Sequence, residues 1–80
     1  MTSKITSKPI TVVRAYSGKG KVALPFRHKA PDYLVKIMSM FATYITHTRS
    51  TTTYVYDYQS FESLLIQLYD KDIDVEIILC

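Results

Sequence analysis

Residues 52–80 constrain the fold most strongly, because they place one helical pattern between two strand-forming runs. The runs 52–58 and 73–80 are rich in β-branched and aromatic residues, which favour strands. The apolar residues between them repeat at the spacing of one helical face: Phe61, Leu64, Leu65 and Leu68. Ser60 is the expected N-cap, because its side-chain oxygen can accept a backbone N–H of the first turn. A helix this short between two strands indicates that the strands run parallel.

A β-hairpin is predicted earlier in the chain. Residues 10–16 and 21–26 read as strands, and the turn between them contains two glycines, which can adopt positive φ. Alternate residues of the second strand form an inward apolar face: Val22, Leu24 and Phe26. Pro25 has no backbone N–H to donate, so this strand is expected to lie at a sheet edge or to end there.

The segment from Asp32 to about His47 is predicted to be a second helix. Pro31 suits the first helical position, and Asp32 adds a favourable negative charge near it. The segment is apolar around most of its circumference, so it must be buried on more than one side. Methionines adapt well to interfaces. Met38 and Met40 are therefore candidate interface residues, in either tight helix–helix packing or a homodimer.

These elements predict an α+β fold, a two-layer α/β sandwich with the order ββαβαβ. Its four-stranded mixed sheet would carry both helices on one face. Residues 1–8 are expected to form a flexible polar arm, and residues 9–80 a single domain. The single cysteine, Cys80, fits a reducing, cytoplasmic setting. No secretory signal or apolar run of membrane-spanning length is recognisable, so no membrane partner is expected.

Charge is unevenly divided along the chain. Residues 1–50 hold nine lysines and arginines against one acid, a net charge of +8, and residues 51–80 hold one lysine against six acids, a net charge of −5. Such asymmetry is typical of a surface that contacts polyanions. The alternative is that the two halves pair their charges on folding and leave a nearly neutral surface.

The basic half predicts a nucleic-acid-binding surface made by the hairpin turn and the loop after the second strand. A glycine-containing turn exposes backbone N–H groups, and the adjacent lysines add positive charge, which suits phosphate. The alternative is an ordinary hairpin tip with solvated lysines. The predicted basic contacts are Arg14, Lys19, Lys21, Arg27, His28 and Lys29.

A row of tyrosines is the second candidate for nucleic-acid contact. Tyr54, Tyr56 and Tyr58 are two residues apart, so on one strand all three would point to the same face. If the helices cover the opposite face, which carries Val55, these rings could stack on the bases of single-stranded RNA. In the alternative arrangement the rings face the helices and form part of the core.

A catalytic or metal site is not predicted. The sequence contains no paired cysteines, no His-x-x-x-His pair and no Gly-x-Ser-x-Gly elbow. His28 could act as a general acid or base on RNA, but it reads more simply as a polar loop residue. Cys80 ends an apolar run and reads as a buried thiol. No cofactor is expected.

We therefore expect a non-enzymatic binding protein that contacts nucleic acid, and RNA rather than DNA. The alternative is a small inhibitor or antidote, for example a viral counter-defence protein, that blocks a nuclease or another basic nucleic-acid-handling protein. Its candidate interface is an acidic cluster near the C-terminal end: Asp70, Asp72, Asp74 and Glu76. Such a cluster could speed association with a basic partner. It could also be a solvated surface that prevents edge-to-edge aggregation.

Overall fold

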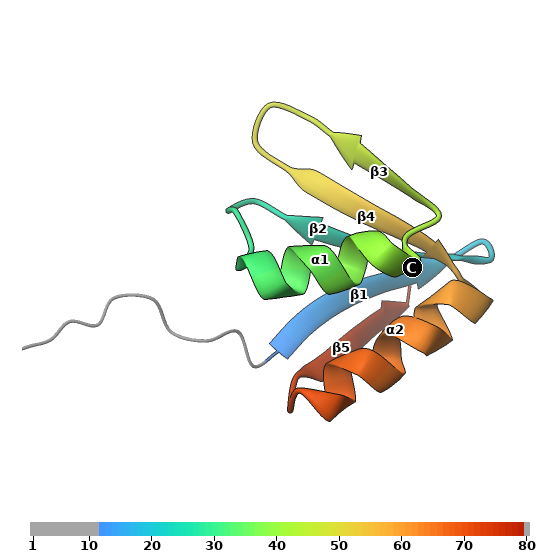
Figure 1. Cartoon of the computed structure of the whole chain (residues 1–80). Coiled ribbons are helices and arrows are strands. Elements are labelled where there is room, and N and C mark those ends of the chain that lie inside the picture. The colour runs from blue at the N-terminus through green and yellow to red at the C-terminus, as the bar shows by residue number, and fades with distance from the viewer. Residues whose placement is uncertain (1–11, 80) are drawn as a thin grey trace, which may run out of the picture.

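The computed structural model describes residues 12–79, which form an α+β fold of five strands and two helices in the order ββαββαβ (Figure 1). The elements are β1 (Val12–Gly18), β2 (Lys21–Phe26), α1 (Asp32–Phe41), β3 (Tyr44–His47), β4 (Thr52–Asp57), α2 (Tyr58–Asp70) and β5 (Asp74–Leu79). The polar arm predicted for residues 1–8, the start of the strand predicted from residue 10, and Cys80 all lie outside the described residues.

The five strands form one mixed sheet in the order β3-β4-β2-β1-β5. Strands β1 and β5 pair in parallel, and the other three neighbouring pairs are antiparallel. Strands β4 and β5 therefore run in the same direction on either side of α2, as predicted, although β2 and β1 lie between them. Both helices cover the same face of the sheet (Figure 1), which confirms the two-layer arrangement. We call the other side of the sheet the open face.

The core lies between the helices and the covered face. Strand alternation sends every second side chain toward the helices, and those that become buried are Val13, Ala15, Val22, Leu24, Tyr54 and Tyr56. The helices contribute Leu34, Met38, Phe61, Leu64 and Leu68. Full burial of each leucine contributes about 1.5–3 kcal/mol. These contacts fix which residues are left on the open face.

Strand β3 is the element that the sequence did not predict. The helix expected to run to about His47 ends at Phe41, and the backbone of Ala42 is extended, with φ −64° and ψ 137°. Residues Tyr44–His47 then pair antiparallel with β4. The sheet therefore has five strands and not four. The β-branched residues Thr43, Ile45 and Thr46 favour an extended backbone, and the Thr43 backbone N–H donates to the Val55 carbonyl oxygen at 2.7 Å.

The start of α2 also differs from the prediction. Its N-cap is Asp57 and not Ser60, because the Asp57 carboxylate accepts the Ser60 backbone N–H at 2.8 Å. That hydrogen bond lowers the pKa of Asp57. The helix consequently begins at Tyr58, so Tyr58 does not continue the strand that holds Tyr54 and Tyr56.

The β1–β2 hairpin was predicted correctly. Of the two expectations for its second strand, the structure has the one in which the strand ends near Pro25, since β2 ends at Phe26, and β2 lies at the centre of the sheet and not at an edge. The two turn residues, Lys19 and Gly20, have φ values of 54° and 78°, as a type I′ hairpin turn requires. Pro25 is accommodated because the β1–β2 ladder runs from Gly18↔Lys21 to Tyr16↔Ala23 and so ends before the proline. Neither helix of the described chain is long and apolar enough to cross a membrane.

Candidate nucleic-acid interface

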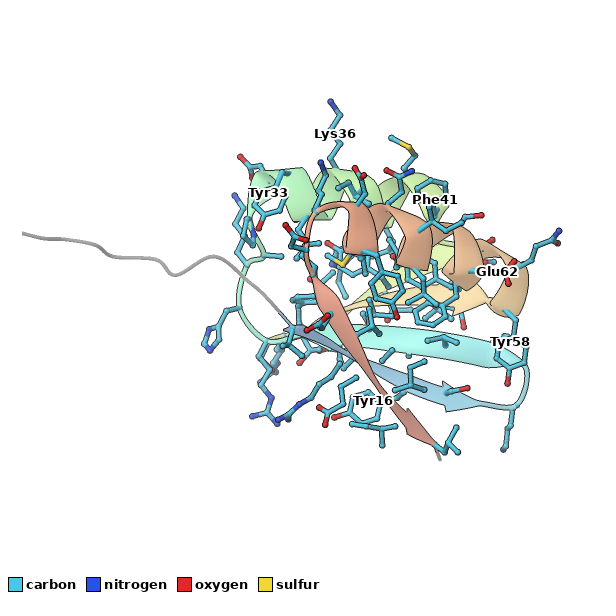
Figure 2. All side chains as sticks on the ribbon, turned by 90° about the horizontal axis from the view of Figure 1, so that it is seen from below. Tyr16, Tyr33, Lys36, Phe41, Tyr58 and Glu62 are labelled. Atoms are coloured by element: carbon cyan, nitrogen blue, oxygen red, sulfur yellow. The ribbon has the colours of Figure 1, made fainter. Side chains whose placement is uncertain are left out.

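One row of apolar side chains crosses all five strands on the open face. Strand register places its members side by side in the order Tyr44, Val55, Ala23, Tyr16 and Ile78. Figure 2 shows Tyr16 on the side of the sheet away from the helices. Tyr44 is 44% exposed. Two aromatic rings therefore flank a floor of small side chains on an otherwise uncovered sheet.

The small residues between the tyrosines leave a shallow recess of about 400 Å³, which we call the tyrosine recess. Its far wall is the hairpin tip, which contributes Lys19 and Lys21. The Lys21 ammonium lies 5.4 Å from the centre of the Tyr44 ring, within the range of a cation–π contact. This recess thus combines aromatic surfaces with positive charge, as sites for stacked bases do.

A second recess, of about 610 Å³, begins where the first ends. Tyr16 lines both recesses, and the second is completed by Arg14, Pro25, Arg27 and Thr51. It lies where β1 and β2 separate beyond their short ladder. Arg27 then forms part of a third recess, of about 290 Å³, between the β2–α1 loop and the β3–β4 loop.

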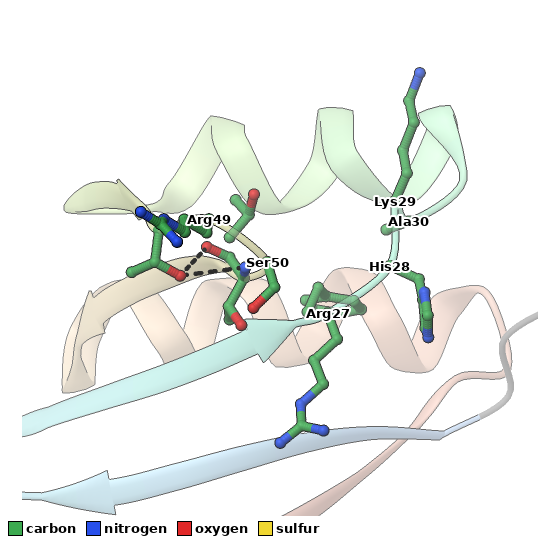
Figure 3. Close-up of a pocket in the computed structure, with 10 residues that line it drawn as sticks. Arg27, His28, Lys29, Ala30, Arg49 and Ser50 are labelled. Atoms are coloured by element: carbon green, nitrogen blue, oxygen red, sulfur yellow. Dashed lines mark hydrogen bonds between the residues drawn. The ribbon is translucent and has the colours of Figure 1, made fainter.

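The loops around the third recess are held by their own hydrogen bonds. The Thr48 backbone N–H donates to the Thr51 carbonyl oxygen at 2.8 Å, and the Thr48 hydroxyl exchanges 3.2 Å hydrogen bonds with the Thr51 backbone (Figure 3). This closed loop carries Arg49. In the same view Arg27 points away from α1 and across β1, whereas Lys29 points in the opposite direction.

Neighbouring recesses share lining residues, so the three form one track, and the charged side chains that line it are basic. Residues 12–79 contain eight lysines and arginines. Six of them line the track: Arg14, Lys19, Lys21, Arg27, Lys29 and Arg49. Among the described residues, none of those lining the track is acidic. The remaining cations, Lys36 and Lys71, lie on α1 and after α2, and Lys36 points away from the sheet (Figure 2).

The predicted basic contacts therefore all lie along this track, but the predicted tyrosines do not. Tyr54 and Tyr56 are 6% and 0% exposed on the covered face, so they form the core and offer no ring surface for stacking. Tyr58 is exposed on the first turn of α2. Of the two arrangements considered for the tyrosine row, the structure has the one in which Tyr54 and Tyr56 face the helices.

The residues predicted for a protein interface also separate. Met38 is fully buried within the chain, so it is a core residue and is not available to a partner, whereas Met40 is 65% exposed. The four acidic residues remain together and exposed at the end of α2 and along β5. Arg14 reaches this group, because its Nε lies 3.1 Å from Oε1 of Glu76.

Tyr16, Tyr44 and Arg49 are candidate contacts that the sequence reading missed. Tyr16 could have been found from strand alternation, since Val13 and Ala15 are the apolar inward positions of β1. Tyr44 was hidden inside the predicted helix. Nothing in the sequence near Arg49 indicates that its loop lies beside the loop that carries Arg27. Within residues 12–79, no three His, Cys, Asp or Glu side chains are grouped so that they could hold a metal ion.

Comparison of the chain with protein-family models, with curated proteins and with solved structures finds no match.

Proposed function

We propose that the open face and the two loops at its end bind single-stranded RNA. The observation that carries this proposal is the continuous track of six cations without an acidic lining residue, which passes directly beside Tyr16 and Tyr44. Phosphates would follow the cations while bases stack on the two rings. A base on Tyr44 would take the ring surface that the Lys21 ammonium now covers, and the ammonium would turn to a phosphate.

Hydroxyl groups favour RNA over DNA as the ligand. Register places Thr46 beside Thr53 on the open face, in the row next to Tyr44 and Val55. Thr51 lines both recesses that contain Arg27. A ribose 2′-OH can donate to and accept from such hydroxyls, and deoxyribose cannot. Stacking on tyrosine rings accepts any base, so we expect broad sequence tolerance.

The deciding experiment measures fluorescence anisotropy of a labelled single-stranded RNA with the variants Tyr16→Ala and Tyr44→Ala. Each loss of a stacking ring should weaken binding by about 5- to 150-fold, equivalent to about 1–3 kcal/mol per base. Tyr33→Ala is the matched control, because Tyr33 is 43% exposed, like Tyr44, but lies on α1. It should leave the affinity unchanged.

Three results would contradict the proposal. The first is no binding at low salt, and the second is an equal loss for Tyr33→Ala, which would show that any exposed ring matters. The third is equal or tighter binding of a DNA strand of the same sequence, which would overturn the assignment to RNA. Circular dichroism of each variant separates a lost contact from a lost fold.

A further inference from the structure

Strand β5 is an edge strand whose two sides differ in chemistry. It pairs in parallel with β1, and no strand within residues 12–79 pairs with its outer edge. Its register with β1 places Val75, Ile77 and Leu79 on the covered side and Asp74 and Glu76 on the open side. Ile77 and Leu79 remain 50% and 81% exposed.

A hollow beside this edge deepens the apolar side. It has a volume of about 250 Å³ and lies between α2 and the β1–β5 side of the sheet. Tyr58, Phe61 and Leu65 form its helix wall, and Ile77 forms its strand wall. Tyr58, Glu62 and Leu65 fall on one stripe of the helix. This stripe continues to Tyr69, which is 55% exposed. The hollow is large enough for one aliphatic side chain.

The charges around the edge are predominantly acidic. Asp74 and Glu76 lie on the open side, Asp70 and Asp72 precede the strand, and Glu62 lines the hollow. Lys71 and Arg14 are the nearby cations, and Arg14 is already paired with Glu76. In an extended segment added to this edge, side chains would alternate between the two sides of the sheet. One set would lie beside the apolar side chains of Val75, Ile77 and Leu79, and the other beside the carboxylates of Asp74 and Glu76.

We propose that the β5 edge binds an extended segment of a partner protein in which apolar residues alternate with lysine or arginine. Backbone hydrogen bonds to the outer edge of β5 would provide affinity. The apolar and acidic sides of β5 would select a segment in which apolar and basic residues alternate. The apolar residues would cover Ile77 and fill the hollow, and the basic residues would lie beside Asp74 and Glu76. The open side of this edge adjoins the track, because Glu76 is paired with Arg14. The outer backbone edge of β5 and the hollow do not line the track, so the proposal does not depend on RNA binding.

A second copy of this chain fits the edge poorly. Antiparallel pairing of two β5 strands would bring the Asp74 and Glu76 side chains of both copies to the same side of the joined sheet. Like charges on neighbouring strands destabilise the pairing, and Arg14 supplies one cation per copy. Charge thus favours a basic segment over self-association.

The test titrates the ¹⁵N-labelled full chain with a synthetic capped heptapeptide that alternates lysine with valine, to about 1 mM. Amide shifts should move at Asp74–Leu79 and along the Tyr58–Tyr69 stripe of α2. A peptide of the same composition, with its valines in one block, should bind at least about tenfold more weakly. A glutamate–valine peptide should not bind.

Two N-methylated versions of the peptide test the backbone pairing. Only one edge of an added strand bonds to β5, so methylation of one alternate set of amides should abolish binding and methylation of the other set should be tolerated. Equal tolerance of both sets would overturn strand addition. Shifts centred on β3, which is the other edge, or no shifts at 1 mM, would overturn the assignment to β5.

Matched variants locate the contact. Ile77→Lys should reduce peptide affinity at least about tenfold, whereas Ile45→Lys, which changes the covered side of the opposite edge strand β3, should not. Asp74→Asn with Glu76→Gln should weaken the basic peptide and leave RNA affinity equal or higher. Slow exchange of the outer β5 amides in the free chain would show that the edge is already occupied by residues 1–11 or a second copy, and would overturn the proposal.

Discussion

The phenol of Tyr56 on β4 donates a 2.8 Å hydrogen bond to the backbone carbonyl oxygen of Met38 on α1. The same carbonyl accepts the Ala42 N–H at 3.0 Å, at the point where α1 ends. Tyr56 is fully buried, so this bond both satisfies the hydroxyl and ties the last turn of α1 to the sheet. A strand tyrosine that the sequence offered as an RNA contact is therefore a structural link between the two layers.

Tyr56→Phe should lower the free energy of unfolding by about 0.5–1.5 kcal/mol, because the ring stays and one buried hydrogen bond is lost. Tyr54→Phe is the control, since its hydroxyl makes no hydrogen bond to the described residues, and it should cost less. Urea unfolding measures both. RNA affinity should not change in either variant, and a large loss for Tyr56→Phe would contradict its placement in the core.

Burial raises the pKa of Tyr56 above its ordinary value of 10, and the neighbouring Tyr54 adds to the effect. The folded state therefore holds the phenol proton more tightly than the unfolded state does. This contribution is complete below pH 10 and is lost as the pH rises further, by up to about 1.4 kcal/mol for each pH unit. Urea unfolding from pH 8 to 11 should show a steeper alkaline loss in the parent chain than in Tyr56→Phe. Parallel curves would disprove the effect.

Asp57→Ala should lower the melting temperature and Ser60→Ala should have little effect, because Asp57 supplies the cap and Ser60 supplies only its backbone N–H. Hydrogen bonding to Ser60 lowers the pKa of Asp57 from its ordinary value of 3.8. The stabilisation is therefore present above pH 3.8 and disappears as the pH falls below it. Melting curves from pH 7 to pH 2 should converge for the parent chain and Asp57→Ala. A larger loss for Ser60→Ala than for Asp57→Ala would show that the Ser60 side chain, and not that of Asp57, caps the helix.

Met38→Ala should cost about 2–5 kcal/mol of unfolding free energy, because it removes a fully buried side chain. Met40→Ala should change the unfolding free energy by less than about 0.5 kcal/mol in a monomer. Analytical ultracentrifugation of the parent chain and of Met40→Ala tests whether Met40 lies in a homodimer interface. If the parent chain is a dimer and Met40→Ala dissociates it, the exposed side of α1 forms the dimer interface.

Lys21→Ala and Arg27→Ala should each reduce the slope of log affinity against log salt by about 0.7 for a single-stranded ligand, if each contacts one phosphate. Lys36→Ala and Lys71→Ala remove the same charge from positions outside the track and should leave the slope unchanged. Anisotropy titrations at several salt concentrations provide the slopes. Equal effects at all four positions would indicate attraction to net charge alone.

The hydrophobic pattern predicted most of the fold, because the apolar residues of most elements repeat at a single spacing. The spacing is two residues in the strands and about 3.6 residues in the helices. This spacing identified the covered face of β2, which carries Val22 and Leu24. It also identified the apolar face of α2, which carries Leu64. The same reasoning failed at residues 42–47. The apolar run that includes Phe41 and Ile45 fits a continuing helix. The extended conformation is more stable only because this segment can pair with the edge of β4, which is a tertiary contact.

The candidate site was less predictable than the fold. Its cations were found from composition, because they dominate the first half of the chain. The aromatic contacts depend on which face of the sheet the helices cover. The helices cover the face that carries Tyr54 and Tyr56, so the tyrosines on the open face are Tyr16 and Tyr44. Arg49 joins the site through the proximity of two loops that are separated in sequence, which no local pattern encodes.

The parallel pairing of β1 with β5 has a consequence for how the chain is made. The Arg14–Glu76 contact spans 62 positions, so the first strand must wait for the last before its outer edge is covered. The β1–β2 hairpin can form early because its contacts are local, whereas closure of the sheet carries a large entropic cost and comes late. A nascent chain that lacks β5 would expose the outer edge of β1 as an unpaired strand edge. Ribosome stalling or truncation before β5 should therefore promote aggregation.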